Sequence, residues 1–320
     1  MRSILPLLKE GNRSSLLAAI VNVFLGAMKG VAFAFTGNVA LFAEMMHSFG
    51  DSANQFFVFI GSALSKKGPT KQFPKGFGRL VNLVCLGAVL IVGILAYETM
   101  KEGVQHILTP AASTGFWISI GVLLIGVVLE GAVLLQAAHE ITKEAGVEHA
   151  GIRTLPIAFK EINRAKPATK LVFLEDFVAT FGGILAIVSI VIAKSTGFYA
   201  MEGIASVLIG LMMFYVVTRV FLDNARGVIG ETDEEMVQHI GELVMHCEDV
   251  VDIDRLEVIK EGEFLHVELI AEVDPNHSLA YLDDIRDHLE QLLLAQKGVN
   301  RVLIAFDEDD QIPEWVQRTY

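Results

Sequence analysis

The chain has 320 residues, of which 52% are hydrophobic, and its mean hydropathy is +0.50. These values exclude an ordinary soluble protein and indicate several membrane-spanning segments. Residues 222–320 carry 7 Lys and Arg against 25 Asp and Glu, whereas residues 1–221 carry 18 against 13. Because binding to nucleic acid would need the opposite sign of charge, no nucleic-acid partner is expected.

Six apolar stretches are long enough to span a bilayer as helices, which takes about 20 residues. In chain order they are Ser15–Phe35, Val39–Ala63, Leu80–Met100, Gly115–Ala138, Lys170–Ala193 and Tyr199–Phe221. Basic residues gather in the N-terminal segment and after the second and fourth spans, which is typical of cytoplasmic loops. We therefore expect a membrane domain of residues 1–221 with the N- and C-termini in the cytoplasm. Nothing at the N-terminus is typical of a signal or transit peptide, which favours the bacterial plasma (inner) membrane over an organelle.

Residues 222–320 are predicted to form a cytoplasmic α+β domain. The expected elements are a helix at Asp233–His246, strands at Val250–Ile259 and Phe264–Val273, a helix at Ser278–Leu294 and a strand at Val299–Phe306. Gly262 is suited to the turn between the first two strands. The order α-β-β-α-β predicts a small ferredoxin-like sheet with helices on one face, and such a domain can pair with a second copy across a dimer axis.

His47 and Asp51 are the most informative residues of the membrane domain. They lie four residues apart, so a helix places both side chains on one face. Ionisable groups inside a bilayer are costly without a partner, and His nitrogen and Asp oxygen both suit divalent transition metals. The alternative is a His–Asp hydrogen bond that only braces helices.

Glu175 and Asp176 in the fifth span supply the complementary carboxylates. The second span runs inward and the fifth outward, so these groups can meet Asp51 at a similar depth. His47, Asp51 and Asp176 then provide three metal ligands, and Glu175 or a water completes the four that Zn²⁺ favours. Adjacent residues of a helix lie about 100° apart, so we favour Asp176 as the direct ligand and Glu175 as a weaker fourth ligand or outer partner.

Other charged residues inside the spans have different expected roles. We expect Lys29 to pair with an acid such as Glu44 or Glu130, and Glu130 to belong to a structural pair or a proton relay. Glu202 lies near the outer end of the sixth span, where it either lines a mouth or is solvated.

Two runs resemble signatures of the cation diffusion facilitator family: TGNVALFAEMMHSFGDSANQ at Thr36–Gln55 and EGIASVLIG at Glu202–Gly210. Further details are similar to the branch that includes the mitochondrial zinc transporter nine, namely Asn54-Gln55, Phe73–Gly78, Glu130-Gly131 and Leu174-Glu175-Asp176. The resemblance covers nearly the whole chain. It implies a homodimer that exports divalent metal, mostly Zn²⁺, in exchange for protons.

The chain departs from the family pattern at two places. The family often has a His where this chain has Val172, and an oxygen-rich site accepts Mn²⁺ or Fe²⁺ more readily. In the tail, Glu268, Asp283 and Asp307 match positions where relatives often bind metal through His. The resemblance therefore implies a dimerisation domain with weak or no metal binding.

The sequence thus predicts a membrane-embedded Zn²⁺/H⁺ antiporter that works by alternating access, is not an enzyme and needs no cofactor. Export of Mn²⁺ or Fe²⁺ is one alternative. Because the fifth span lacks the usual His, a metal-sensing scaffold that does not transport is another. An intramembrane metalloprotease would need an HExxH-like pair, which the sequence does not contain.

Overall fold

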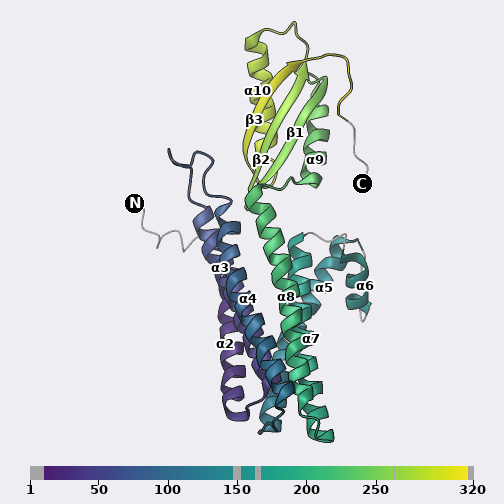
Figure 1. Cartoon of the computed structure of the whole chain (residues 1–320). Helices are drawn as coiled ribbons and strands as arrows, with labels where there is room; N and C mark the ends of the chain where they lie inside the picture. Colours follow the sequence, from purple (N-terminus) through teal and green to yellow (C-terminus); the bar gives the residue numbers. More distant parts are fainter. Residues whose placement is uncertain (1–10, 147–152, 163–166, 263, 316–320) are drawn as a thin grey trace. The chain divides into compact units, whose positions relative to one another are not determined.

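The computed structural model describes residues 11–146, 153–162, 167–262 and 264–315 (Figure 1). The chain divides into two compact units. One contains residues 12–60 and 84–223 and is a bundle of long helices. The other contains residues 61–83 and 224–320 and includes a small sheet with two helices.

Each of the six predicted spans coincides with one long helix. The helices are α2 (Arg13–Thr36), α3 (Val39–Ser65), α4 (Leu80–Leu108), α5 (Phe116–Glu144), α7 (Pro167–Thr196) and α8 (Ala200–Ile229). A short helix that the sequence did not predict, α6 (Thr154–Glu161), follows α5. Pro167 begins α7, where its missing N–H and fixed φ suit the first turn of a helix.

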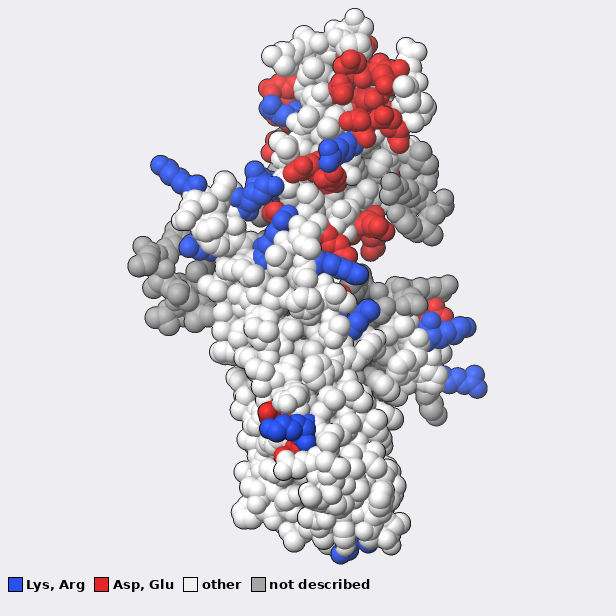
Figure 2. Space-filling view, in the orientation of Figure 1, with Lys and Arg blue, Asp and Glu red and all other residues white. Residues whose placement is uncertain are grey.

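Five of these helices, α2, α4, α5, α7 and α8, are long and apolar enough to cross a membrane. The sixth, α3, has 27 residues but carries His47, Asp51 and several other polar side chains, which lower its hydropathy. Large apolar side chains such as Leu90, Trp117 and Val128 are exposed on the outside of the bundle. Figure 2 shows a broad surface over these helices that is nearly free of charged residues. The chain is therefore an integral membrane protein.

Small residues let the helices of the bundle approach closely. A Cβ atom added at Gly203 on α8 would lie 2.6 Å from the carbonyl oxygen of Gly103 on α4. Alanines dominate the buried core of this unit, as is usual where membrane helices pack without large side chains. At the α2–α3 connection, Gly37 adopts φ 63°, and the Asn38 side chain accepts a hydrogen bond of 2.9 Å from the backbone N–H of Leu41.

The second unit has the predicted order of elements. They are α9 (Glu234–Met245), β1 (Asp252–Glu261), β2 (Phe264–Val273), α10 (Leu279–Leu294) and β3 (Val299–Glu308). Asp233 and Ser278 cap the two helices through their side chains. The strand order is β1-β2-β3, with the first pair antiparallel and the second parallel, so the sheet is small and mixed.

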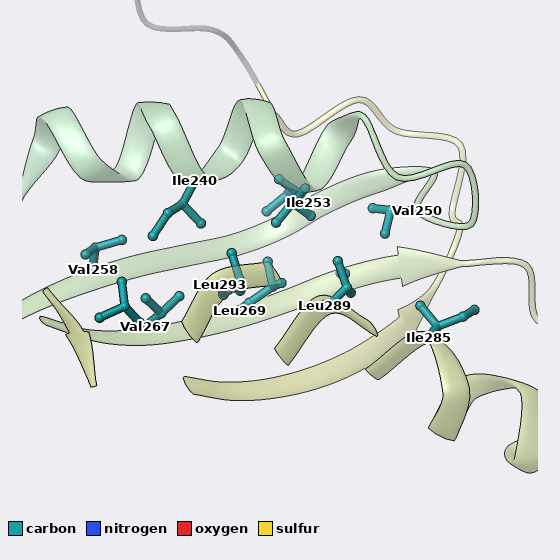
Figure 3. Packing of buried hydrophobic residues seen from close by; sticks show 12 residues of the cluster. Ile240, Val250, Ile253, Val258, Val267, Leu269, Ile285, Leu289 and Leu293 are labelled. Carbon is teal, nitrogen blue, oxygen red and sulfur yellow. The ribbon is translucent and has the colours of Figure 1, made fainter. Parts of the chain in front are cut away.

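One apolar core holds this unit together (Figure 3). Ile240 of α9 and Leu289 of α10 are completely buried against Val258 of β1 and Val267 and Leu269 of β2. Because both helices contribute to the same cluster as the strands, the unit has its own hydrophobic core. Its surface is acidic, and Figure 2 shows Asp and Glu side chains gathered on it.

Candidate metal site

Helix α3 places His47 and Asp51 one turn apart in the bundle. The Nε2 atom of His47 lies 3.4 Å from Oδ2 of Asp51, and the His47 side chain is almost fully buried. In the described part of the chain, this nitrogen has no hydrogen-bond partner. The two side chains are thus in close ionic contact without a hydrogen bond between them, which leaves this nitrogen available as a metal ligand.

Asp51 and Glu175 line the same small cavity, together with Asn54 and hydrophobic neighbours. The cavity has a volume of about 20 Å³, which is room for one water-sized particle. Asn54 donates a hydrogen bond of 3.0 Å from its Nδ2 to Oε1 of Glu175, and this bond joins α3 to α7. The sequence singled out Asn54 only as part of a motif. Its role as the partner of Glu175 became evident from the three-dimensional arrangement.

Asp176 of α7 also lies near enough to Asp51 and Glu175 to act on their charges, and one of its carboxylate oxygens lacks a hydrogen bond among the described residues. Its Oδ2 atom is buried and lacks a hydrogen-bond partner in the described part of the chain. Its carboxylate repels that of Asp51, and both repel Glu175. The like charges of Asp51, Glu175 and Asp176 lie near enough to act on one another, and a divalent cation would neutralise them.

The described residues do not form a closed coordination sphere. Among them, no three His, Cys, Asp or Glu side chains are grouped closely enough to hold a metal ion. The ligand set His47, Asp51, Asp176 and Glu175 therefore stays a prediction.

A second group of charges lies inside the bundle around Lys29 of α2. The Nζ atom of Lys29 donates to Glu44 Oε2 at 2.9 Å, to Glu130 Oε1 at 2.9 Å and to Ser48 Oγ at 3.0 Å. The predicted pairing of Lys29 is confirmed, and it involves both acids rather than one. Ser48 was not predicted as a partner of Lys29, although its position four residues after Glu44 puts it on the same face of α3.

Glycines on α5 and α7 make room for this group. A Cβ atom at Gly182 would lie 2.6 Å from Oε1 of Glu44, and one at Gly126 would lie 3.2 Å from Cε of Lys29. The adjacent pair Gly182-Gly183 within a predicted span was the available signal, because paired glycines permit another group to approach the helix axis.

Glu202 is buried at the start of α8, with 1% of its surface exposed. Oε1 of Glu202 accepts a hydrogen bond of 2.7 Å from Ser113, and Oε2 lies 4.0 Å from Nε2 of His106. The alternative of a solvated position is therefore wrong, because the carboxylate is buried and takes its hydrogen bond from Ser113. These partners come from the end of α4 and from the loop after it, which hydropathy alone does not bring next to α8.

Comparison with protein-family models accounts for both units of the chain. Residues 15–227 match the model of the cation efflux transmembrane domain, and residues 232–309 match that of the cation efflux protein, cytoplasmic domain. The chain belongs to the cation efflux family.

Among its relatives, this cation efflux protein is 25% identical over 246 residues to the mouse mitochondrial proton-coupled zinc antiporter SLC30A9. That match covers 76% of the chain but 42% of the mouse protein. An uncharacterized transporter of Methanocaldococcus jannaschii, MJ0449, is 21% identical and matches over 94% of this chain and 99% of its own length. The human probable proton-coupled zinc antiporter SLC30A4 is 24% identical, over 95% of the chain and 72% of its own length. The chain thus spans less than half the length of the SLC30A9 relatives.

Proposed function

We propose that this cation efflux protein exports a divalent metal cation, Zn²⁺ in the first instance, in exchange for protons. Relatives named proton-coupled zinc antiporters support both the cation and the coupling ion. Within the chain, the observation that carries the proposal is the facing of α3 and α7 at one small cavity. Asp51 and Glu175 line this cavity, and Nε2 of His47, which has no hydrogen-bond partner among the described residues, lies 3.4 Å from Oδ2 of Asp51.

The proposed ligands are His47, Asp51 and Asp176, with Glu175 as a fourth ligand or as an outer partner held by Asn54. Metal binds these groups only when the imidazole is neutral and the carboxylates are ionised. Protonation of the same groups lowers their affinity for metal. A proton gradient can therefore drive release on the far side while the helices rock around the site.

The lack of a second His leaves two alternatives with specific support. Val172, rather than His, lies one turn before Asp176, so the donor set is rich in oxygen and also suits Mn²⁺ or Fe²⁺. A metal-sensing scaffold would bind the ion without moving it. Metal binding without uptake into liposomes would favour that scaffold.

For the assembly, we propose six spans, with α3 crossing the membrane beside the five more apolar helices. The boundary between the two domains is proposed at residues 221 and 222, with both termini in the cytoplasm. The name of the second family model, a cytoplasmic domain, supports the side assigned to the tail. We propose a homodimer in a bacterial plasma membrane, although the SLC30A9 relatives carry the word mitochondrial in their names.

Flux through proteoliposomes across a panel of Zn²⁺, Mn²⁺ and Fe²⁺, with internal pH recorded, tests the proposal. The wild-type chain should couple entry of one of these ions to proton movement. Asp51→Ala and Asp176→Ala should each reduce metal-dependent proton flux to the level of protein-free liposomes, because each removes a ligand. Glu175→Gln and Glu175→Ala, measured separately, show whether its charge is needed.

Glu98→Gln provides the matched control, since Glu98 is an exposed acid on α4 that pairs with Lys101. It should transport like the wild type. Flux at the wild-type rate in both Asp51→Ala and Asp176→Ala would overturn the site. Absence of coupled flux for every ion in the wild type would overturn the proposed function.

A further inference from the structure

The charges around Lys29 do not balance. Glu44 and Lys29 are completely buried, and Glu130 is 9% exposed. Two ionised carboxylates and one ammonium leave one negative charge in an apolar bundle. A buried charge of this kind needs a partner, and the cheapest way to remove it is to bind a proton.

The hydrogen bonds around Lys29 also indicate that a proton is missing, because the group has too few donors. An ammonium has three N–H donors, and Lys29 uses one each on Glu44, Glu130 and Ser48. Nothing is left to donate to the second oxygen of either acid. Accordingly, Oε1 of Glu44 and Oε2 of Glu130 are both buried without a hydrogen-bond partner in the described part of the chain. A proton on either carboxyl group converts one of these oxygens to an O–H donor and neutralises the group.

The group is placed to sense the metal site. Glu44 lies three residues before His47 and seven before Asp51, so all three occupy one face of α3. Its carboxylate also reaches Gly182 of α7, the helix that carries Asp176. Among the described residues, titratable groups that interact electrostatically with Glu44 or Glu130 include Lys29, His47, Asp51 and Asp176.

We propose that Glu44 and Glu130 together hold one shared proton beside Lys29, and that a divalent cation at the neighbouring site expels it. This inference rests on the proposed antiport and assigns part of its proton exchange to residues outside the metal ligands. The positive charge of the incoming ion raises the cost of the extra proton. The carboxyl O–H bond breaks, the proton leaves to solution, and the carboxylate that remains compensates the metal charge.

The test counts the protons released when Zn²⁺ binds to the purified full-length protein in weakly buffered detergent solution. A pH indicator gives the protons, and calorimetry in the same solution gives the Zn²⁺ stoichiometry. Glu130→Gln and Glu44→Gln should each release about one proton fewer per Zn²⁺ than the wild type. In each variant Lys29 neutralises the charge of the one acid that remains, so that acid binds no extra proton. The double variant should also release about one fewer, not two, since the proton is shared.

A charge-balanced variant distinguishes proton binding by Glu44 and Glu130 from a purely structural role of these residues. Lys29→Met combined with Glu130→Gln leaves Glu44 as the one acid of the group, which must again be protonated, so the wild-type count should return. Glu98→Gln should keep the wild-type count.

Several results would overturn the proposal. One is an unchanged proton count in both single variants with Zn²⁺ still bound, and another is an additive loss of two protons in the double variant. A third is a wild-type proton count that falls when Na⁺ replaces choline as the cation of the solution, because Na⁺ and not a proton would then neutralise the two acids. Each of these leaves the flux test of the antiport intact, so the two proposals fail separately.

Discussion

At the scale of single residues, Glu272 on β2 shows how the acidity of the tail acts on stability. This side chain is 4% exposed, and its Oε2 atom has no hydrogen-bond partner among the described residues. Burial, and then the nearby carboxylates of Asp310 and Asp252, raise the pKa of Glu272 above its ordinary value. An acid whose pKa is higher in the folded state than in the unfolded state loses its stabilising contribution as the pH rises above the unfolded value.

Glu272→Gln should therefore unfold at a higher temperature than the wild type at pH 7, and at nearly the same temperature at pH 4. At the lower pH both side chains are neutral, so the difference between them disappears. Thermal unfolding of the full-length protein followed by circular dichroism measures both temperatures. Glu290→Gln, at an exposed position on α10, should show no such dependence on pH. A lower unfolding temperature for Glu272→Gln at pH 7 would contradict the prediction.

The residue scale also shows what the sequence can predict about the candidate site. The four-residue spacing of His47 and Asp51 predicts their proximity, because a helix fixes it. The choice between Glu175 and Asp176 is different, since α7 is apolar on every side and its pattern does not reveal its rotation about its own axis. The structure puts Glu175 at the cavity with Asp51, and the hydrogen bond from Asn54 fixes that side chain. No local pattern identifies Asn54 as this donor.

At the scale of elements, the sequence predicts where α3, α4, α5 and α8 begin better than where they end. Helix α4 continues from the predicted end at Met100 to Leu108, and α8 continues from Phe221 to Ile229. Hydropathy marks the stretch of apolar side chains, whereas backbone hydrogen bonding continues into polar sequence without a change. The strands and helices of the tail were predicted to within about two residues, because capping residues and alternation mark their ends.

The close approach of α4 and α8 gives a prediction for this scale. Gly203→Ala should reduce the free energy of unfolding by about 1–3 kcal/mol, because the new methyl group would overlap the carbonyl oxygen of Gly103. Gly93→Ala on α4 is the control, since its Cβ would meet nothing within 4 Å. That change should be neutral or add about 0.5–1 kcal/mol, as alanine favours the helix over glycine. Unfolding in detergent with increasing denaturant measures both, and equal stability of the two variants would refute the packing argument.

At the scale of the whole molecule, the number of crossings decides where the tail lies. Six spans put both termini on one side of the membrane, whereas five put them on opposite sides. The test uses single cysteines at Lys71, Ala111 and Lys297 in a background with Cys85 and Cys247 replaced by Ser. All three positions are exposed, and Ala111 lies in the connection between α4 and α5.

With six spans, a membrane-impermeant maleimide added to intact cells should label Ala111→Cys only. Lys71→Cys and Lys297→Cys should react only after permeabilisation, because both lie on the cytoplasmic side. Labelling of Lys71→Cys from outside would mean that α3 does not cross, and the six-span assignment would then be wrong.

The α2–α3 connection has a consequence for biogenesis. Helix α3 is not among the helices that are apolar enough to cross a membrane alone, and α2, although apolar, carries a buried lysine that is costly in lipid without a partner. The Lys29–Glu44 ion pair joins these two helices, and only Gly37 and Asn38 separate them along the chain. The two segments therefore leave the translocon most favourably as one helical hairpin whose charges are already paired. A mutation of Lys29 would then reduce the yield of inserted protein as well as alter its ion exchange.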